Sequence, residues 1–243
     1  METSNYDQQT INSRNPLARF AHRTRVKRSV QLATPRVGCG KIMDYGCGSG
    51  VFVAKMNSIK EEVAVGYEPY MSERAVGGLP IYAEFEEVER HGPYHTVTLF
   101  ETIEHLADGE LDEFLDRCGR ALVPGGVILI SAPIEIGPAL LLKEANRSIL
   151  RFKAPEYGFL EFLKAVILGI PGRRAPDIKT SHRGFDFRRS IRYLETKGWR
   201  AEVLGYSPIP MGTWYGNSQV FLAVRKDPSR GIEGRLCESD SEE

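Results

Sequence analysis

The alternation of apolar and polar positions along the chain predicts strands and helices in turn. Lys41–Tyr45 is a short apolar run that leads into a glycine-rich turn and then into a helix-like segment, Val51–Ile59. Residues 63–67 and 95–100 are further short apolar runs of the kind that form buried strands. Because strands alternate with helical segments, the chain is predicted to form a parallel sheet with right-handed crossovers.

Helical and strand-like spacing extends the pattern on both sides of this unit. The further predicted elements are a leading amphipathic helix at Pro16–Ala33, a helix at 108–122 stopped by Pro124-Gly-Gly126, a strand at 127–131, a helix at 187–198 and strands at 200–206 and 219–225. The last two strands are expected to form an antiparallel pair at the edge of the sheet. The expected fold class is therefore α/β, a Rossmann-like doubly wound sheet that is mostly parallel with an antiparallel C-terminal edge hairpin.

Between residues 132 and 180 the pattern changes to proline-, glycine- and leucine-rich pieces, which predict an inserted helical cap. A chain of 243 residues is most simply one domain, which we expect to cover residues 16–225. Residues 1–15 are expected to be flexible, and residues 226–243, with little apolar content, to be a disordered acidic tail.

Composition and charge narrow the classes of partner and compartment. Lys plus Arg and Asp plus Glu both number 32, so no overall field would attract nucleic acid, and no nucleic acid partner is expected. Positive charge is nevertheless concentrated between Arg14 and Arg36. The four cysteines lack the spacing of a zinc site or a disulfide framework, and no apolar run approaches the ~18 residues of a membrane span. We therefore expect a cytoplasmic protein.

The turn after the first strand is shaped for a ligand. Gly46, Gly48 and Gly50 remove the Cβ atoms that would block a close approach to the backbone. A nicotinamide-binding oxidoreductase would place the third glycine one residue later, so that class is disfavoured. Glu68 ends the second strand, 18 residues beyond Gly50, where a carboxylate can accept hydrogen bonds from both hydroxyls of a ribose. A nucleoside ligand is therefore predicted.

Four motifs follow one another along the chain, and their order adds to what each indicates alone. They are Asp44-Tyr-Gly-Cys-Gly-Ser-Gly50, Glu68, Glu101-x-x-Glu104-His105-Leu106 and Leu122-Val-Pro-Gly-Gly126. Together they resemble the class I S-adenosylmethionine-dependent methyltransferases. The resemblance implies S-adenosylmethionine as the cofactor, with Asp44 and the glycine turn facing its methionine part, Glu68 its ribose and Glu84 its adenine. The cofactor-binding residues implied in this way are Asp44, Gly46, Cys47, Gly48, Gly50, Glu68 and Glu84.

The segment after the fourth strand carries the candidate catalytic chemistry. His105, with Glu101 nearby, is a candidate base for a hydroxyl acceptor. On a helical turn, Glu101, Glu104 and His105 would stand at i, i+3 and i+4 and could share a cation. The segment is similar to that of ubiquinone-pathway O-methyltransferases and small-RNA 2′-O-methyltransferases, in which the corresponding positions hold a divalent metal. His182 resembles a downstream histidine that completes the site in the RNA enzymes.

The implied metal ligands are thus Glu101, Glu104, His105 and His182. A purely structural role of the E-H-L segment remains the alternative to metal binding.

The acceptor is expected to bind between the cap and the leading helix. Apolar residues at 159–168, beside Lys164, Arg173 and Arg174, can line an apolar channel, touch a membrane surface or pack as an ordinary core. The expected function is O-methylation of a small or lipid-linked molecule, a sugar being one option. Two alternatives stay open, a cofactor-binding protein without transfer activity and a metal-assisted RNA 2′-O-methyltransferase. The sequence does not indicate the oligomeric state.

Overall fold

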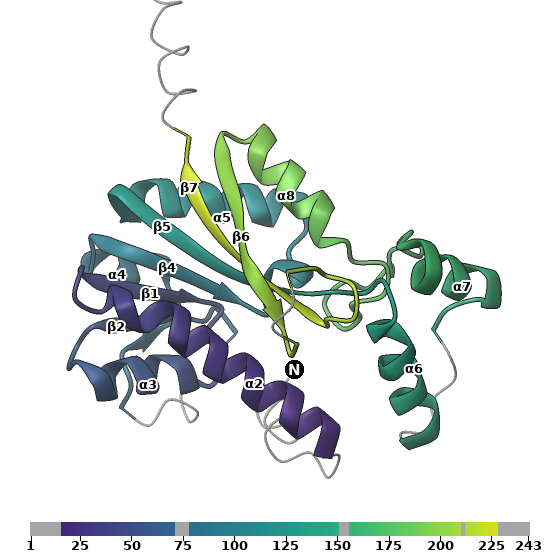
Figure 1. Cartoon of the computed structure of the whole chain (residues 1–243). Helices are drawn as coiled ribbons and strands as arrows, with labels where there is room; N and C mark the ends of the chain where they lie inside the picture. Colours follow the sequence, from purple (N-terminus) through teal and green to yellow (C-terminus); the bar gives the residue numbers. More distant parts are fainter. Residues whose placement is uncertain (1–15, 71–77, 151–155, 210–211, 228–243) are drawn as a thin grey trace, which may run out of the picture.

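A seven-stranded sheet organises the computed structural model, which describes residues 16–70, 78–150, 156–209 and 212–227 (Figure 1). The strand order is β3-β2-β1-β4-β5-β7-β6. The strands are β1 (Lys41–Tyr45), β2 (Ala64–Tyr67), β3 (Ile81–Tyr82), β4 (Tyr94–Phe100), β5 (Leu122–Pro133), β6 (Trp199–Ser207) and β7 (Gln219–Lys226).

The direction of the strands confirms the predicted sheet. Strands β3, β2, β1, β4 and β5 pair in parallel, whereas β7 is antiparallel to both β5 and β6. The β6–β7 pair is the predicted antiparallel hairpin, with β7 inserted between β5 and the edge strand β6. Gln219, the first residue of β7, lies opposite Pro133 at the end of β5 and opposite Ser207 at the end of β6. The start of β7 therefore meets the carboxyl ends of its two neighbours, at the edge where open α/β sheets bind ligands.

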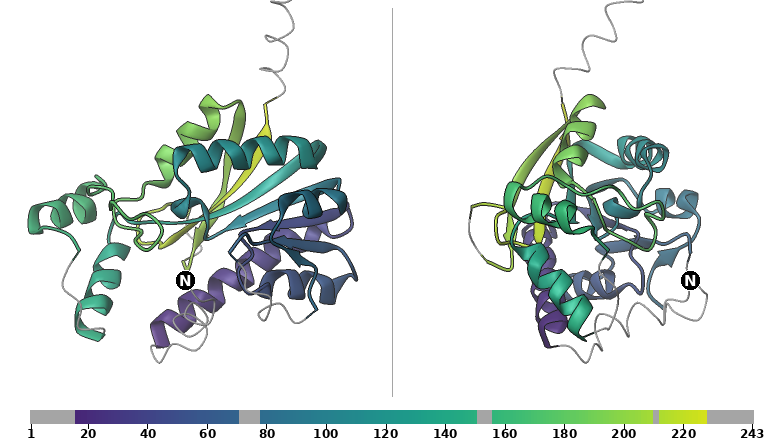
Figure 2. Two further views of the ribbon diagram at one scale, coloured as in Figure 1. Left: turned by 180° about the vertical axis from the view of Figure 1, so that it is seen from behind. Right: turned by 90° about the vertical axis from the view of Figure 1, so that its right-hand side faces the viewer.

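Helices cover both faces of the sheet (Figure 2). Helices α2 (Pro16–Ala33) and α3 (Val51–Ile59) pack on one face, and α4 (Phe85–Arg90), α5 (Asp108–Ala121) and α8 (Phe187–Thr196) pack on the other. Helix α5 buries an apolar side spaced three and four residues apart, as its sequence predicts. It ends at Ala121, one residue before the predicted end, because Leu122 already pairs with Tyr94 as the first residue of β5.

Two helices after β5 stand apart from the sheet, α6 (Ala139–Leu150) and α7 (Phe159–Leu168) (Figures 1 and 2). They occupy the segment predicted to form a helical cap. They share a small core of their own, made by Leu140, Tyr157, Ala165 and Val166. Helix α7 stops at Gly169, whose φ of 62° lies in the left-handed region that favours glycine.

The predicted flexible N-terminus, residues 1–15, lies outside the described residues, as does the predicted tail from residue 228 onward. Lys226, which was expected in the tail, is the last residue of β7. None of the described helices is long and apolar enough to cross a membrane.

Candidate active site

The turn between β1 and α3 is formed by glycines in left-handed backbone conformations, with φ of 73° at Gly46, 54° at Gly48 and 75° at Gly50. A side chain at Gly46 would collide with Thr102, and one at Gly50 would collide with Ile81. At Gly48, in contrast, an added Cβ would meet nothing within 4 Å. The outer glycines are thus required by packing, and the middle one faces the space into which a ligand can enter.

Glu68 is held against this turn. The parallel pairing of Tyr45 with Tyr67 brings the ends of β1 and β2 side by side, so that the residue after β2 faces the glycines. The backbone N–H of Gly48 donates a hydrogen bond of 2.9 Å to Glu68 Oε2, and that of Tyr70 donates one of 3.2 Å to Oε1. The carboxylate is therefore oriented in advance, as recognition of a ribose requires.

Asp44, near the end of β1, is a buried acid. Its Oδ1 accepts a 2.6 Å hydrogen bond from the hydroxyl of Thr98. Burial raises the pKa of Asp44 to about 7, and the nearby carboxylate of Glu68 adds to the shift, which the Thr98 hydrogen bond opposes. Asp44 is therefore partly ionised near neutral pH.

The side chains of the two remaining predicted cofactor residues, Cys47 and Glu84, make fewer polar contacts with the glycine turn. The Cys47 side chain lies over Gly66, where an added Cβ would be 2.6 Å from Cys47 Sγ, and burial raises the pKa of the thiol. Cys47 can therefore contribute its backbone but is not an activated nucleophile. Glu84 is exposed just before α4 and makes no hydrogen bond that caps this helix. Its role toward an adenine stays a prediction.

The segment after β4 differs from the helical turn that the sequence suggested. The 3-10 helix η3 spans only Ile103–His105, and Glu101 precedes it with a φ of 55°. This left-handed conformation is uncommon for a residue other than glycine. Glu101 therefore lies outside the short helical turn that carries Glu104 and His105. The expected spacing of the three residues on one helical turn is therefore wrong, although the Glu101 carboxylate still lies near enough to Glu104 and His105 to shift the pKa of each.

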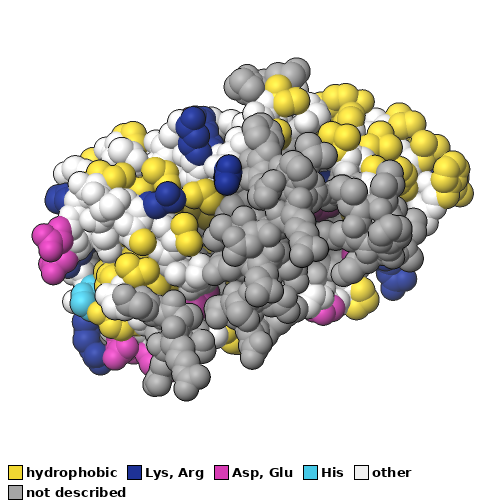
Figure 3. All heavy atoms as spheres, turned by 90° about the horizontal axis from the view of Figure 1, so that it is seen from below, with side chains coloured by type: hydrophobic (Ala, Val, Ile, Leu, Met, Phe, Trp, Pro, Cys, Tyr) yellow, Lys and Arg dark blue, Asp and Glu magenta, His cyan; other side chains and the backbone are white. Residues whose placement is uncertain are grey.

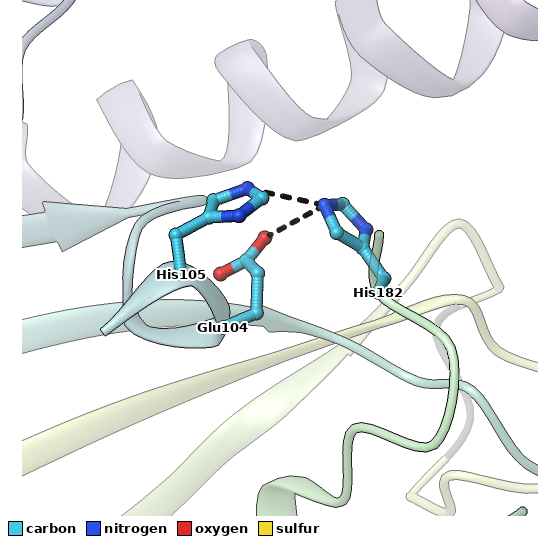
Figure 4. Close-up of side chains that lie close together, drawn as sticks. All are labelled: Glu104, His105 and His182. Atoms are coloured by element: carbon cyan, nitrogen blue, oxygen red, sulfur yellow. Dashed lines mark hydrogen bonds and ion pairs between the residues drawn. The ribbon is translucent and has the colours of Figure 1, made fainter. Parts of the chain in front are cut away.

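Glu104, His105 and His182 nevertheless come together, with one potential ligand atom of each within 4.8 Å of the others (Figure 4). His182 Nε2 lies 3.2 Å from His105 Nε2 and 3.7 Å from Glu104 Oε1. His105 Nδ1 is 2.9 Å from the backbone oxygen of Ile178, an acceptor, so Nδ1 must carry the proton. The lone pair of neutral His105 is thus on Nε2, directed at the cluster.

Glu104 makes this cluster incomplete. Its side chain is fully buried, yet neither carboxylate oxygen has a hydrogen-bond partner among the described residues. Burial raises the pKa of Glu104 well above its ordinary value, and the nearby Glu101 carboxylate raises it further. Burial and then His105 lower the pKa of His182 to about 4, so both imidazoles are neutral at pH 7.

These three side chains fit a divalent cation. Imidazole nitrogens bind such metals at about 2.0–2.1 Å, which places neighbouring ligand atoms of one coordination sphere roughly 3 Å apart. The 3.2 Å separation of the two Nε2 atoms agrees with this spacing. The hydrogen bond of His105 Nδ1 to a backbone carbonyl is the outer-sphere contact typical of metal-binding histidines.

Glu101, the fourth predicted ligand, faces a different set of partners that the sequence did not suggest. Arg25 from α2 donates to Glu101 Oε2 at 2.5 Å, while Ser131 and Gln219 donate to Oε1. Burial pushes the pKa of Glu101 upward, but Arg25 and Gln219 outweigh it and the pKa lies below its ordinary value. Glu101 is therefore a carboxylate whose charge a guanidinium already balances.

Arg174 is the second residue that sequence reasoning placed differently. It was named only as a basic residue beside the apolar residues of the cap, but its guanidinium is bound to backbone around the Glu104 cluster. It donates hydrogen bonds to the backbone oxygens of Glu104, Ser181 and Arg183. Arg174 thus ties the Glu104 turn to the residues on either side of His182, and no local sequence signal marks such a contact.

Comparison with known proteins places this geometry in a family. The model of a methyltransferase-domain family matches residues 16–162. A ubiquinone biosynthesis O-methyltransferase of Caulobacter sp. (strain K31) is 28% identical over 156 residues, which are 58% of this chain and 60% of that protein. A second such enzyme, of Proteus mirabilis, is 29% identical over 37% of this chain and 41% of its own length. The chain therefore spans about 60% or less of these relatives' lengths.

Solved structures share the fold. A SAM-dependent methyltransferase from Archaeoglobus fulgidus superposes with a TM-score of 0.54 at 14% identity, covering 93% of this chain and 100% of that one. The 1,6-didemethyltoxoflavin-N1-methyltransferase of Burkholderia thailandensis, solved with S-adenosylhomocysteine, has a TM-score of 0.54 at 12% identity and covers 93% and 87%. At these identities the likeness establishes the fold alone.

Proposed function

The chain belongs to the class I S-adenosylmethionine-dependent methyltransferases, and from this premise we propose that it methylates a hydroxyl oxygen of a small or lipid-linked molecule with the help of a divalent cation. The observation that carries the proposal is the pair of buried oxygens of Glu104, which have no hydrogen-bond partner among the described residues and face two neutral imidazoles. A buried carboxylate without partners is costly, and a cation at this place would offset the cost.

The residues divide into two groups by what each would do. The glycine turn, Asp44 and Glu68 would hold the cofactor, with Gly48 admitting it to the backbone. Glu104, His105 and His182 would hold the cation, which when bound would acidify the acceptor hydroxyl. Much of the rate would then come from holding the acceptor oxygen in line with the methyl group.

The geometry supports one of the two roles predicted for His105. Since Nδ1 donates to Ile178, Nε2 is the only nitrogen of neutral His105 with a free lone pair. It can bind a cation or accept the acceptor's proton, but it cannot do both at once. We assign it as a ligand, because His182 Nε2 faces it at 3.2 Å. Glu101 would serve as a fourth ligand or as a base only after parting from Arg25.

The named relatives and the cap together suggest the acceptor class. The matched relatives are ubiquinone biosynthesis O-methyltransferases, which supports a hydroxylated small-molecule acceptor. The cap exposes an apolar patch, which supports an acceptor with an apolar or lipid-linked part; a lipid-linked sugar stays within this proposal. The apolar patch comprises Leu141, Leu142, Phe159, Leu160, Leu163, Ile167, Leu168 and Ile170. No specific observation favours an RNA acceptor.

The same apolar patch supports peripheral contact with an anionic membrane from the cytoplasmic side. Hydrophobic side chains gather at the α6–α7 end of the molecule (Figure 3). Phe159, the most exposed of them at 77%, lies on the same helix as the exposed Lys164, and Arg173 is exposed nearby. Flotation with phosphatidylglycerol vesicles should recover the wild type and lose Phe159→Ser, whereas equal recovery of both would refute the contact.

Radiolabelled methyl transfer tests the main proposal. The purified chain, S-adenosylmethionine and a panel of phenolic and prenylated phenolic acceptors should give product with Mg²⁺ or Mn²⁺, and EDTA should abolish it. Glu104→Gln should behave like the EDTA-treated wild type, and the exposed Glu87→Gln should behave like the untreated one. Product formation that EDTA and Glu104→Gln leave intact would overturn the cation. Cofactor binding without product from any acceptor or cell extract would favour a binding protein.

A further inference from the structure

A cavity lies between α2 and the carboxyl end of β6, near the candidate active site. Its volume is about 460 Å³, within the range that accommodates small-molecule ligands. Thr24, Lys27, Arg28 and Gln31 line it from α2. Lys27 and Arg28 each stand three or four residues from both Thr24 and Gln31, so the four positions form one side of the helix. The residues from Leu204 to Pro208 line the opposite wall.

The cavity is cationic. Lys27 and Arg28 both line it, and no carboxylate is among its lining residues. In the described ranges of the chain, neither of these two cations forms an ion pair. The hydroxyls of Thr24 and Ser207 and the amide of Gln31 add neutral hydrogen-bond donors. A guanidinium, an ammonium and hydroxyl groups around one space suit a phosphoryl group, whose several oxygens accept many hydrogen bonds.

The β6 wall is built to lie close to Arg28. The register of β6 against β7 shifts between Val203 and Gly205, which marks a bulge, and Gly205 has a φ of 145°. A Cβ added at Gly205 would lie 3.6 Å from Arg28 Nη2, so the guanidinium rests directly against this backbone. Bulges are frequent beside active sites, where they redirect a strand locally.

The cavity is joined to the candidate active site on two sides. Ser207 lies opposite Gln219 in the sheet, and the Gln219 amide donates to Glu101. On α2, Arg25 pairs with Glu101, and Arg28 follows about 5 Å along the helix axis. A molecule bound at Lys27 and Arg28 thus lies within about one helical turn of the residue that contacts Glu101.

From this arrangement we propose that the cavity binds a phosphoryl group of the methyl acceptor, with Arg28 and Lys27 as its cationic ligands. The inference rests on the proposed function in that it names part of the acceptor. A diphosphate linked to a lipid and one linked to a nucleoside share this chemistry.

Calorimetric titration of the full chain with inorganic pyrophosphate, in EDTA and without cofactor, tests the site. Arg28→Gln should weaken binding at least about fivefold and Lys27→Gln about threefold, because each removes one charge-assisted contact. Arg28→Lys should fall between wild type and Arg28→Gln, since it keeps the charge and loses the fork of donors. The exposed Arg23 lies on the same helix and does not line the cavity, so Arg23→Gln should match the wild type.

Two results would overturn the site. One is no heat of binding with folded wild type, and the other is an equal loss in Arg23→Gln, which would indicate only the general field of α2. A thermal unfolding scan checks the fold of each variant. If Arg28→Gln fails to fold, the exposed Lys27 carries the test.

Titrations with two further ligands identify the source of the phosphoryl group, and a variant of Glu104 separates this inference from the proposed function. Tighter binding of geranyl diphosphate than of pyrophosphate supports a lipid-linked acceptor, and tighter binding of uridine diphosphate supports a nucleotide-linked one. Equal binding of all three supports recognition of the phosphoryl group alone. Glu104→Gln should bind pyrophosphate like the wild type. A chain without metal-dependent methyl transfer can therefore still support the phosphoryl site. A chain that does not bind pyrophosphate can still support the proposed methyl transfer.

Discussion

The glycine turn and the Glu104 cluster are built in opposite ways. The turn comes from contiguous residues, 44–50, and its polar neighbours satisfy one another, as Gly48 does by donating to Glu68. The cluster joins Glu104 and His105 to His182, 77 residues beyond His105, and leaves the Glu104 oxygens without hydrogen-bond partners among the described residues. The turn is therefore complete without a ligand, whereas the cluster holds a buried carboxylate that a cation or a proton must neutralise.

Replacing Glu104 should have the largest effect on activity and should test the contrast between the glycine turn and the cluster. Glu104→Gln should lower kcat by about 10²–10⁴-fold, the range that assisted deprotonation of a hydroxyl contributes, because the cation that would acidify the acceptor is lost, and it should leave S-adenosylhomocysteine affinity unchanged. Without metal, its free energy of unfolding should equal or exceed that of the wild type, because glutamine needs neither the cation nor the proton that the buried Glu104 carboxylate requires. Steady-state kinetics and chemical denaturation measure the two quantities. Lower stability with unchanged kcat would instead assign Glu104 a structural role.

Replacing Glu68 should affect the other region alone. Glu68→Ala should weaken S-adenosylhomocysteine binding by about 1.5–3 kcal/mol, the contribution of hydrogen bonds to a charged group, which is roughly 10–150-fold in affinity. Calorimetry measures this loss, and a parallel Mn²⁺ titration should show unchanged metal affinity. A variant that loses both ligands together would mean that the two regions are not separate sites.

The contrast also explains what the sequence could predict. Lys41–Tyr45, the glycine turn and Val51–Ile59 were predicted with the bounds that the structure has, because hydrophobic period and glycine conformation act locally. Glu68 follows from the spacing of two adjacent parallel strands. The contact of Glu68 with Gly48 follows from the same pattern, because both residues lie at the ends of these neighbouring strands.

The surroundings of Glu101 could not be predicted in the same way. Its left-handed backbone breaks the helical spacing that was expected to align it with Glu104. Its partners, Arg25 and Gln219, lie 76 and 118 residues away in the chain, so only the folded sheet brings them together. Arg174 has an ordinary basic-surface context in the sequence and contacts backbone oxygens, which carry no residue-specific signal.

Arg174 sharpens the comparison because it acts on the cluster only through the backbone. Arg174→Gln should release the Glu104 turn from the residues around His182 and weaken Mn²⁺ binding by about tenfold, the lower end of the effect of outer-sphere substitutions. Electron paramagnetic resonance of free Mn²⁺ measures the affinity. Arg174→Lys should restore part of it, and cofactor affinity should not change. An unchanged Mn²⁺ affinity would reduce Arg174 to a residue that supports the cap.

The smallest expected effect concerns Asp44, the residue of the glycine-turn region that is partly ionised near neutral pH. Its pKa is raised to about 7, mainly by burial, so Asp44 is largely neutral at pH 6 and largely ionised at pH 8. The resemblance places the methionine part of the cofactor beside Asp44, and its ammonium would bind the ionised form.

Affinity for S-adenosylhomocysteine should therefore rise roughly threefold between pH 6.5 and 7.5, a window in which the ligand's amino group stays mostly protonated. His182 is neutral across this window, because burial and His105 lower its pKa to about 4, and burial also lowers the pKa of His105. Stability should change in the opposite direction. Since the folded-state pKa exceeds the unfolded one, the stabilising contribution of Asp44 is complete below the unfolded pKa and is lost as the pH rises through about 7. Asp44→Asn should remove both dependences, and a threefold rise that persists in this variant would trace the titration to another group.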